Sequence, residues 1–181
     1  GASNIKKLFA KAQADNMPAM AITDHGNMFG VFDFVATANK FNVKPIVGCE
    51  FYVVEDHTRK QFTKEQKDKR VHQLLLAKNA EGYKNLTKLC SLGYMEGLYS
   101  KYPRVTKALI EKYKDGLIAS TCCIGASVPQ QILKNGEDAG EKEFKWWLDM
   151  FGEDYYIEIQ RHEIPEQNIV NEVLLKWAKK Y

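Results

Sequence analysis

The sequence predicts an α/β fold in which short strands alternate with helices around a mostly parallel sheet or barrel. Five short runs rich in Ile, Val, Leu, Phe and Tyr have the composition of buried strands. Stretches with apolar residues three or four positions apart, the spacing of an amphipathic helix, separate them. The chain has 181 residues, 45% hydrophobic and 27% charged, which excludes a disordered chain, a collagen and a coiled coil. The alternation therefore indicates a globular α/β domain.

The N-terminal part of the chain contains the first two strand and helix pairs. Helical spacing at 5–12 predicts a helix with Ser3 as its N-cap. An apolar run at 19–23 predicts a buried strand, and helical spacing resumes at 29–41. A second strand is expected at 45–54, where Ile, Val, Phe and Tyr are frequent.

The remaining elements continue the same alternation. Three further strands are expected at 72–77, 116–121 and 154–160. Helices are expected after the first of these strands up to residue 93, and at 106–113, 144–151 and 170–177. Residues 94–105 have no regular pattern. Because no repeat, linker or low-complexity segment interrupts the chain, we expect one compact domain.

Residues 55–71 differ from the rest because nearly all of them are polar. This composition favours a solvated loop between two strands. A loop that contacts phosphate groups is the alternative, since several of its residues are basic.

Charge and cysteine content limit the classes of partner and compartment. The net charge of +3 and pI near 8.5 permit nucleic acid as a partner without requiring it. The four cysteines include no C-x-x-C pair, so a structural zinc ribbon is not expected. No signal peptide pattern or membrane-spanning run is visible. We therefore expect a protein of the reducing cytoplasm that has no membrane partner.

The ends of the expected strands carry side chains that bind metals. His25, Glu50, Cys123 and His162 lie in or just after four of these strands. In α/β folds the carboxyl ends of the strands gather at one edge, so these side chains can converge there. Imidazole, carboxylate and thiolate are ligands of zinc and similar divalent ions.

Each of these residues also has a structural interpretation. Asp24 can cap the following helix, with His25 as a polar loop residue. Glu50 lies among apolar residues and must be paired or metal-bound. Cys123 can be a small buried hydrophobic residue. His72 precedes its strand and reaches the same edge only if that strand runs antiparallel or the preceding loop folds back.

Five blocks of the sequence resemble a known family. The most specific are 21–30 (AITDHGNMFG), 44–50 (KPIVGCE) and 72–86, followed by 116–129 and 158–167. Together they resemble the PHP (polymerase and histidinol phosphatase) domain of bacterial replicative DNA polymerase III alpha subunits. The resemblance covers essentially the whole chain.

The resemblance implies a fold more specific than the strand pattern does. The family fold is a distorted seven-stranded β/α barrel, similar to a TIM barrel. Residues 1–181 would form a PHP domain fragment of about five strands, with helices outside and the first and last barrel strands missing. We therefore expect an open barrel edge. The polymerase domains would lie outside this chain.

The resemblance also implies roles for individual residues. His25, Glu50, His72 and Cys123 would be metal ligands, and Asp24 would support them; Asp24 and His25 would be the catalytic residues. The expected cofactor is a divalent metal, namely zinc, manganese or magnesium. The site would be incomplete, because the family's His-x-His and Asp-x-His strands have no counterpart among the four histidines. His162 is outside the implied ligand set.

The implied function has two levels. The parent protein would be a DNA-directed DNA polymerase, a nucleotidyltransferase of DNA replication. The domain itself would be a metal-dependent 3′–5′ exonuclease or phosphoesterase, or else a metal-stabilised scaffold for a proofreading exonuclease subunit. DNA and other replisome subunits would be partners. The alternative is a stand-alone phosphatase of the histidinol-phosphatase type.

Overall fold

The fold is built on one six-stranded sheet, seen in a computed structural model that describes residues 3–181. Five strands form its main path, in the order β1 (Ala19–Ile22), β2 (Lys44–Val53), β3 (Val71–Ala77), β5 (Leu117–Ser120) and β6 (Tyr155–Tyr156). The sixth strand, β4 (Arg104–Val105), pairs with the last residues of β2.

The sheet is mixed rather than mostly parallel, which corrects the expectation for β3. This strand is antiparallel to both of its neighbours, β2 and β5, whereas the other pairs are parallel. The reason is the connection from β2 to β3, a loop without the helix that a parallel crossover requires. Over residues 3–181 the sheet does not close on itself, in line with the expected open edge. The seven-stranded barrel stays a prediction.

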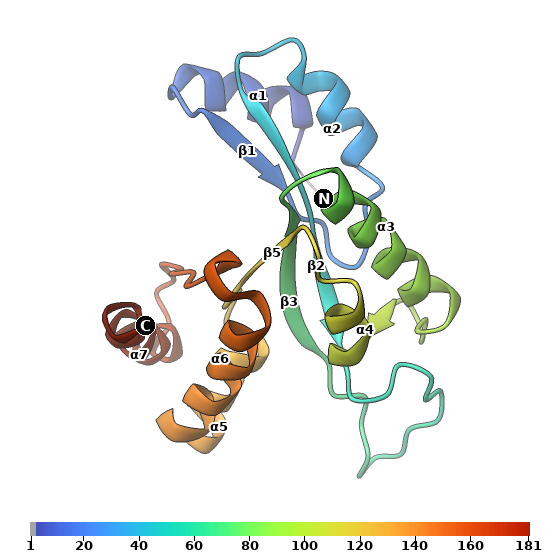
Figure 1. Ribbon diagram of the computed structural model, residues 1–181, viewed down its shortest axis with the longest axis vertical. Helices are drawn as coiled ribbons and strands as arrows, with labels where there is room; N and C mark the ends of the chain where they lie inside the picture. Colours follow the sequence, from blue (N-terminus) through green and yellow to red (C-terminus); the bar gives the residue numbers. More distant parts are fainter. Residues whose placement is uncertain (1–2) are drawn as a thin grey trace.

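Seven α-helices of the described chain surround the sheet (Figure 1). They are α1 (Ile5–Ala14), α2 (Val31–Ala38), α3 (Ala80–Met95), α4 (Lys107–Lys112), α5 (Ser127–Asn135), α6 (Glu137–Phe151) and α7 (Pro165–Lys180). A 3₁₀ turn, η1 (Gly152–Asp154), precedes β6. Helices α1 and α2 lie around β1 at the upper end, while α5, α6 and α7 gather on the side opposite α3 (Figure 1).

Two apolar clusters hold these elements together. The larger one joins the sheet to α3–α7 and contains the fully buried Leu75, Trp147 and Trp177. The smaller one, around Phe9 and Phe34, packs α1 and α2 beside β1. The part that carries β1 thus has its own small core, and it joins the rest mainly through the pairing of β1 with β2.

Local differences from the sequence expectation have simple causes. Asn4, not Ser3, caps α1: its Oδ1 accepts a hydrogen bond from the Lys7 N–H at 3.0 Å. The segment 94–105 contains β4, which is too short to show a periodic pattern. Helix α5 was not expected, because Pro129 interrupts its pattern; proline is tolerated there since it lies in the first turn. The last strand, expected at 154–160, is shorter in the structure, where β6 covers only Tyr155–Tyr156.

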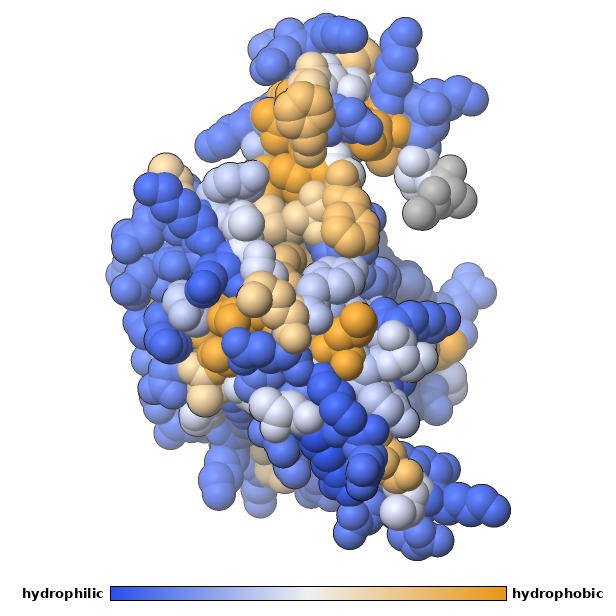
Figure 2. Space-filling model, turned by 90° about the vertical axis from the view of Figure 1, so that its right-hand side faces the viewer, coloured by the Kyte–Doolittle hydropathy of each residue, from blue (hydrophilic) through white to orange (hydrophobic). Residues whose placement is uncertain are grey.

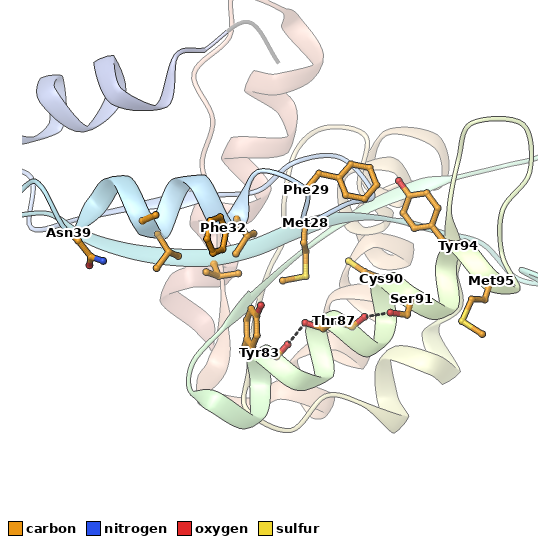
Figure 3. A pocket seen from close by; sticks show the side chains of 14 residues that line it. Met28, Phe29, Phe32, Asn39, Tyr83, Thr87, Cys90, Ser91, Tyr94 and Met95 are labelled. Atoms are coloured by element: carbon orange, nitrogen blue, oxygen red, sulfur yellow. Dashed lines mark hydrogen bonds between the residues drawn. The ribbon is translucent and has the colours of Figure 1, made fainter.

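An apolar groove of about 990 Å³ lies between α2 and α3. Figure 2 shows the apolar side chains on this face of the molecule, and Figure 3 shows those that line the groove. Phe32 and Met95 are 81% and 79% exposed. The hydroxyls of Thr87 and Ser91 donate to backbone carbonyls of α3.

None of the helices in the described residues is long and apolar enough to cross a membrane.

Candidate metal centre

Four side chains from different parts of the sequence meet at one end of the sheet. Glu50 Oε1 lies 2.6 Å from His72 Nδ1 and 3.3 Å from His25 Nε2. The Cys123 Sγ atom lies 3.9 Å from the same carboxylate oxygen and 3.4 Å from His72 Nδ1. The cluster of His25, Glu50, His72 and Cys123 is therefore centred on the Glu50 carboxylate.

The end of β1 places His25 beside Glu50. The Glu50 N–H donates to the Asp24 carbonyl at 3.0 Å, and the Gly26 N–H donates to the Glu50 carbonyl at 2.8 Å. Gly26 has a φ of +70°, and a Cβ there would lie 2.8 Å from Cγ of Pro103. Only glycine fits both the left-handed backbone and the close contact, so Gly26 fixes the turn that carries His25.

The antiparallel direction of β3 brings His72 to the cluster. His72 is the second residue of β3 and pairs with Tyr52, two residues after Glu50 on β2. Its N–H donates to the Gly125 carbonyl at 3.0 Å, which ties β3 to the segment after β5. An antiparallel β3 is the condition under which His72 reaches the same edge as the other candidate ligands.

A tight turn after β5 presents Cys123. Cys122 has a φ of +58°, unusual for a residue with a side chain. The Cys122 N–H donates to Ser120 Oγ at 3.0 Å, and that hydroxyl donates to Glu158 Oε2 at 2.7 Å. Ser120 and Glu158 thus support the turn, and sequence reasoning missed this role. Only the polar Ser120 at the end of an apolar run could have indicated it.

Hydrogen bonding within the cluster shifts the protonation of its members. Hydrogen bonds to Cys123 and Glu50 raise the pKa of His72 to about 10. A hydrogen bond from Cys122 lowers the pKa of Cys123 to about 5, and the bond with His72 acts in the same direction. Burial would raise this pKa, but the hydrogen bonds outweigh it. Burial alone would raise the pKa of Glu50, but the two histidines hold it below its usual range. These interactions favour the charged forms of the three groups, namely the Glu50 carboxylate, the Cys123 thiolate and the His72 imidazolium.

The donor set fits a divalent cation. Ligand atoms of His25, Glu50 and His72 lie within 4.8 Å of one another, and so do those of Glu50, Cys122 and Cys123. Nitrogen, oxygen and sulfur donors at such spacing suit zinc and related ions. His72 must lose its extra proton to act as a ligand, so binding of a cation is coupled to proton release.

Two residues from the sequence analysis lie outside the cluster. The backbone of Asp24 holds Glu50, but its carboxylate points towards Gly30 at the start of α2, close to where a Cβ of Gly30 would lie. His162 is exposed, and its Nε2 lies 3.2 Å from Gln160 Oε1. His162 follows the end of β6 by six residues and is not among the side chains grouped around Glu50, in agreement with its place outside the implied ligand set.

The polar loop between β2 and β3 is solvated but anchored. Arg104 of β4 is fully buried beneath it. Its guanidinium donates to the carbonyls of His57 and Arg59 and to Asp68 Oδ1, at 3.0, 2.6 and 3.0 Å. Most of the loop's side chains are exposed, while the bonds from Arg104 to the His57 and Arg59 carbonyls hold its backbone.

Fold and site together define an α/β domain in which side chains that could hold a metal ion gather near the strand ends. The family model "PHP domain" matches residues 1–162. The chain belongs to the PHP domain family, which confirms the resemblance seen in the sequence.

The curated relatives carry one name. The chain is 44% identical to DNA polymerase III subunit alpha of Borreliella burgdorferi over 99% of its own length and 16% of that protein. It is 41% identical to the same subunit of Thermus aquaticus over all of its length and 15% of that protein. The chain therefore spans about one sixth of the length of these relatives.

A solved structure shares the fold. A protein classed as a metal-dependent phosphoesterase from Bifidobacterium adolescentis superposes with a TM-score of 0.58 over 99% of this chain and 79% of the other. The two sequences are 14% identical, so this likeness concerns the fold alone.

Proposed function

We propose that this chain is the PHP module of a bacterial replicative DNA polymerase alpha subunit. We further propose that its cluster binds divalent metal and supports 3′–5′ removal of nucleotides from DNA. The observation that carries the proposal is the meeting of His25, Glu50, His72 and Cys123 around one carboxylate oxygen. The names of the relatives support the polymerase context.

The residues of the cluster would have different roles in such a reaction. Zinc, manganese or magnesium, when bound, supplies a water of lowered pKa and polarises a phosphoryl oxygen. Glu50 and Cys123 would provide the negative charge that holds a cation, and His25 and His72 would be the further ligands. His25, with a side chain 60% exposed, lies on the open side and faces an incoming phosphate. Asp24 acts through its backbone, which fixes Glu50.

The proposed context is the replisome in the bacterial cytoplasm. DNA would reach the module through the polymerase, and a proofreading exonuclease subunit and other replisome subunits would be its protein partners. The four cysteines are free thiols, which suits a reducing compartment.

Hydrolysis of a labelled single-stranded oligonucleotide tests the catalytic proposal. We expect the chain loaded with Mn²⁺ or Zn²⁺ to shorten the strand from its 3′ end. His25→Ala should reduce the rate by at least about a hundredfold, since it removes a group at the reacting phosphate. His162→Ala, a histidine outside the cluster, is the matched control and should leave the rate unchanged.

Three results would contradict the catalytic proposal. If the metal-loaded chain binds metal but does not hydrolyse DNA, the module is a metal-stabilised scaffold. If it hydrolyses p-nitrophenyl phosphate but not the oligonucleotide, it is a phosphomonoesterase. If both histidine variants keep the full rate, the cluster is not the site of the reaction.

A further inference from the structure

A row of aromatic rings leads away from the metal cluster along β2. Tyr52 lies two residues after Glu50, so both side chains are on the same face of the strand. The Tyr52 ring contacts that of its cross-strand partner His72, with centroids 5.5 Å apart, and lies 6.4 Å from that of His25. Tyr102 continues the row, 5.0 Å from Tyr52 and nearly perpendicular to it. The half-buried Tyr52 and Tyr102 rings form a ledge directly beside the cluster.

The outer end of this row is cationic. The Arg70 guanidinium lies over the Tyr102 ring, 3.7 Å from its centroid, and Lys101 Nζ lies 5.6 Å from the same centroid. Asp68 pairs with Arg70 and also with the buried Arg104. Asp68 pairs with both arginines, and Lys101 adds a further cation beside Tyr102, so positive charges outnumber negative ones among these four groups.

The two arginines have different functions. Arg104 is fully buried, and its nitrogen atoms are used by Asp68 and by the carbonyls of Gly97, His57 and Arg59. Arg70 stays 26% exposed and has only Asp68 as an ion-pair partner among the described residues. Arg104 therefore fixes Asp68, and Asp68 holds Arg70 over the Tyr102 ring. Arg70 is the arginine available to a ligand.

We infer that Tyr52, Tyr102 and Arg70, named here the aromatic shelf, bind the nucleotide adjacent to the reacting phosphodiester of a single-stranded nucleic acid. Aromatic rings stack on bases of any sequence, and a planar guanidinium suits a phosphate group. The inference rests on the proposed function for the position of the reacting phosphate. It extends that function, because two rings and a cation leading away from the cluster suit a chain of nucleotides better than an isolated phosphate.

The shelf can be tested without any hydrolysis. Binding of a short fluorescent oligothymidylate to the whole chain is measured by anisotropy in EDTA and again in Zn²⁺. Tyr102→Ala should weaken binding roughly five- to 150-fold, the range for loss of one base–aromatic stack. Tyr102→Phe should keep the affinity, and Tyr102→Leu, which preserves the packing volume, should lose it. Tyr83→Ala on α3 removes an exposed tyrosine outside the shelf and should bind like the unmodified chain.

The contribution of Arg70 can be measured from the salt dependence of oligonucleotide affinity. Arg70→Gln should lower the magnitude of the slope of log affinity against log salt concentration by about 0.7, the value for one phosphate contact on a single strand. Arg161→Gln, which removes an exposed arginine elsewhere, should leave the slope unchanged.

The outcomes separate this inference from the proposed function. If Tyr102→Leu binds the oligonucleotide as tightly as the unmodified chain does, the shelf inference is overturned, whether or not the protein hydrolyses DNA. If competition by inorganic phosphate removes all oligonucleotide binding at low concentration, the site recognises a phosphate alone, and the inference is also overturned. If Tyr102→Ala and Tyr102→Leu weaken binding but no hydrolysis occurs, the shelf stands and the nuclease proposal is wrong.

Discussion

At the scale of single residues, the candidate metal centre depends on backbone positions as much as on its candidate ligands. Glu50 is reached from three directions because the Gly26 turn, the start of β3 and the Cys122 turn each deliver one ligand to it. Two of these turns use left-handed backbone, at Gly26 and Cys122. Such conformations are maintained by surrounding contacts, and they are frequent at functional sites. The geometry of the cluster should therefore be sensitive to residues that carry no ligand atom.

Gly26→Ala tests this sensitivity. The new Cβ would meet Pro103 at 2.8 Å and Tyr52 at 3.1 Å, and it would also strain a backbone with φ +70°. We expect a loss of about 1–3 kcal/mol in the free energy of unfolding, measured with urea, and weaker binding of zinc. Gly152→Ala is the matched control, since Gly152 also has positive φ but no atom within 4 Å of the new Cβ. Equal effects of the two substitutions would show that the contacts of Gly26 do not matter.

At the scale of elements, partly buried polar contacts fix how the helices meet each other. Glu143 of α6 forms an ion pair with Lys107 of α4 at 2.6 Å and accepts a hydrogen bond from Trp147 Nε1 at 2.9 Å. Burial alone would raise the pKa of Glu143, but these bonds, with one from Ser127 of α5, hold it below its usual range. One carboxylate therefore links three helices.

Glu143→Gln should lower the free energy of unfolding by an amount that depends on pH. Because the pKa of Glu143 is lowered by folding, its contribution is complete above its unfolded value near 4.5 and disappears as the pH falls through the folded value. We expect the variant to be about 1–3 kcal/mol less stable at pH 7, by urea denaturation, and the difference to shrink in acid. Glu141→Gln on the same helix, with an exposed partner Lys180, should change stability little. A difference that persists unchanged at pH 3 would contradict this assignment.

The elements also show what sequence patterns can and cannot predict. The helices α1, α2, α3 and α7 and the strands β1, β2, β3 and β5 follow from periodicity, because each is long or apolar enough to show it. Strand β4 has two residues, so its existence depends on pairing with β2 rather than on local sequence. The direction of β3 is a tertiary property, and the strand pattern alone left it open.

The site could be predicted only in part for the same reason. His25, Glu50 and Cys123 follow from the rule that side chains at strand ends gather at one edge. His72 required the family resemblance, because its place in the cluster depends on an antiparallel strand. Glu158 and the aromatic shelf act through contacts between distant segments, for which a single sequence contains no signal, and for Ser120 the only signal is a polar residue at the end of an apolar run.

At the scale of the whole molecule, the cluster lies where the two parts of the fold join. Its four members come from the ends of β1, β2, β3 and β5, so one bound ion would connect four segments of the open sheet. The part with β1, α1 and α2 has a separate small core and is held to the rest mainly by the pairing of β1 with β2. A ligand that bridges His25 to the other three residues should therefore stabilise this junction most.

This junction gives a prediction for the intact chain. A metal that binds only the folded state stabilises it by an amount that grows with its concentration, about 2.7 kcal/mol at one hundred times the dissociation constant. We expect zinc to raise the melting temperature, EDTA to reverse the rise, and hydrogen exchange to slow most in β1 and in the turn that carries His25. Glu50→Gln should remove the response, because every other ligand contacts this carboxylate, whereas Glu163→Gln, an exposed glutamate elsewhere, should keep it. Metal protection spread evenly over the sheet, or retained in Glu50→Gln, would mean that the ion binds elsewhere and does not connect β1 to the rest of the fold.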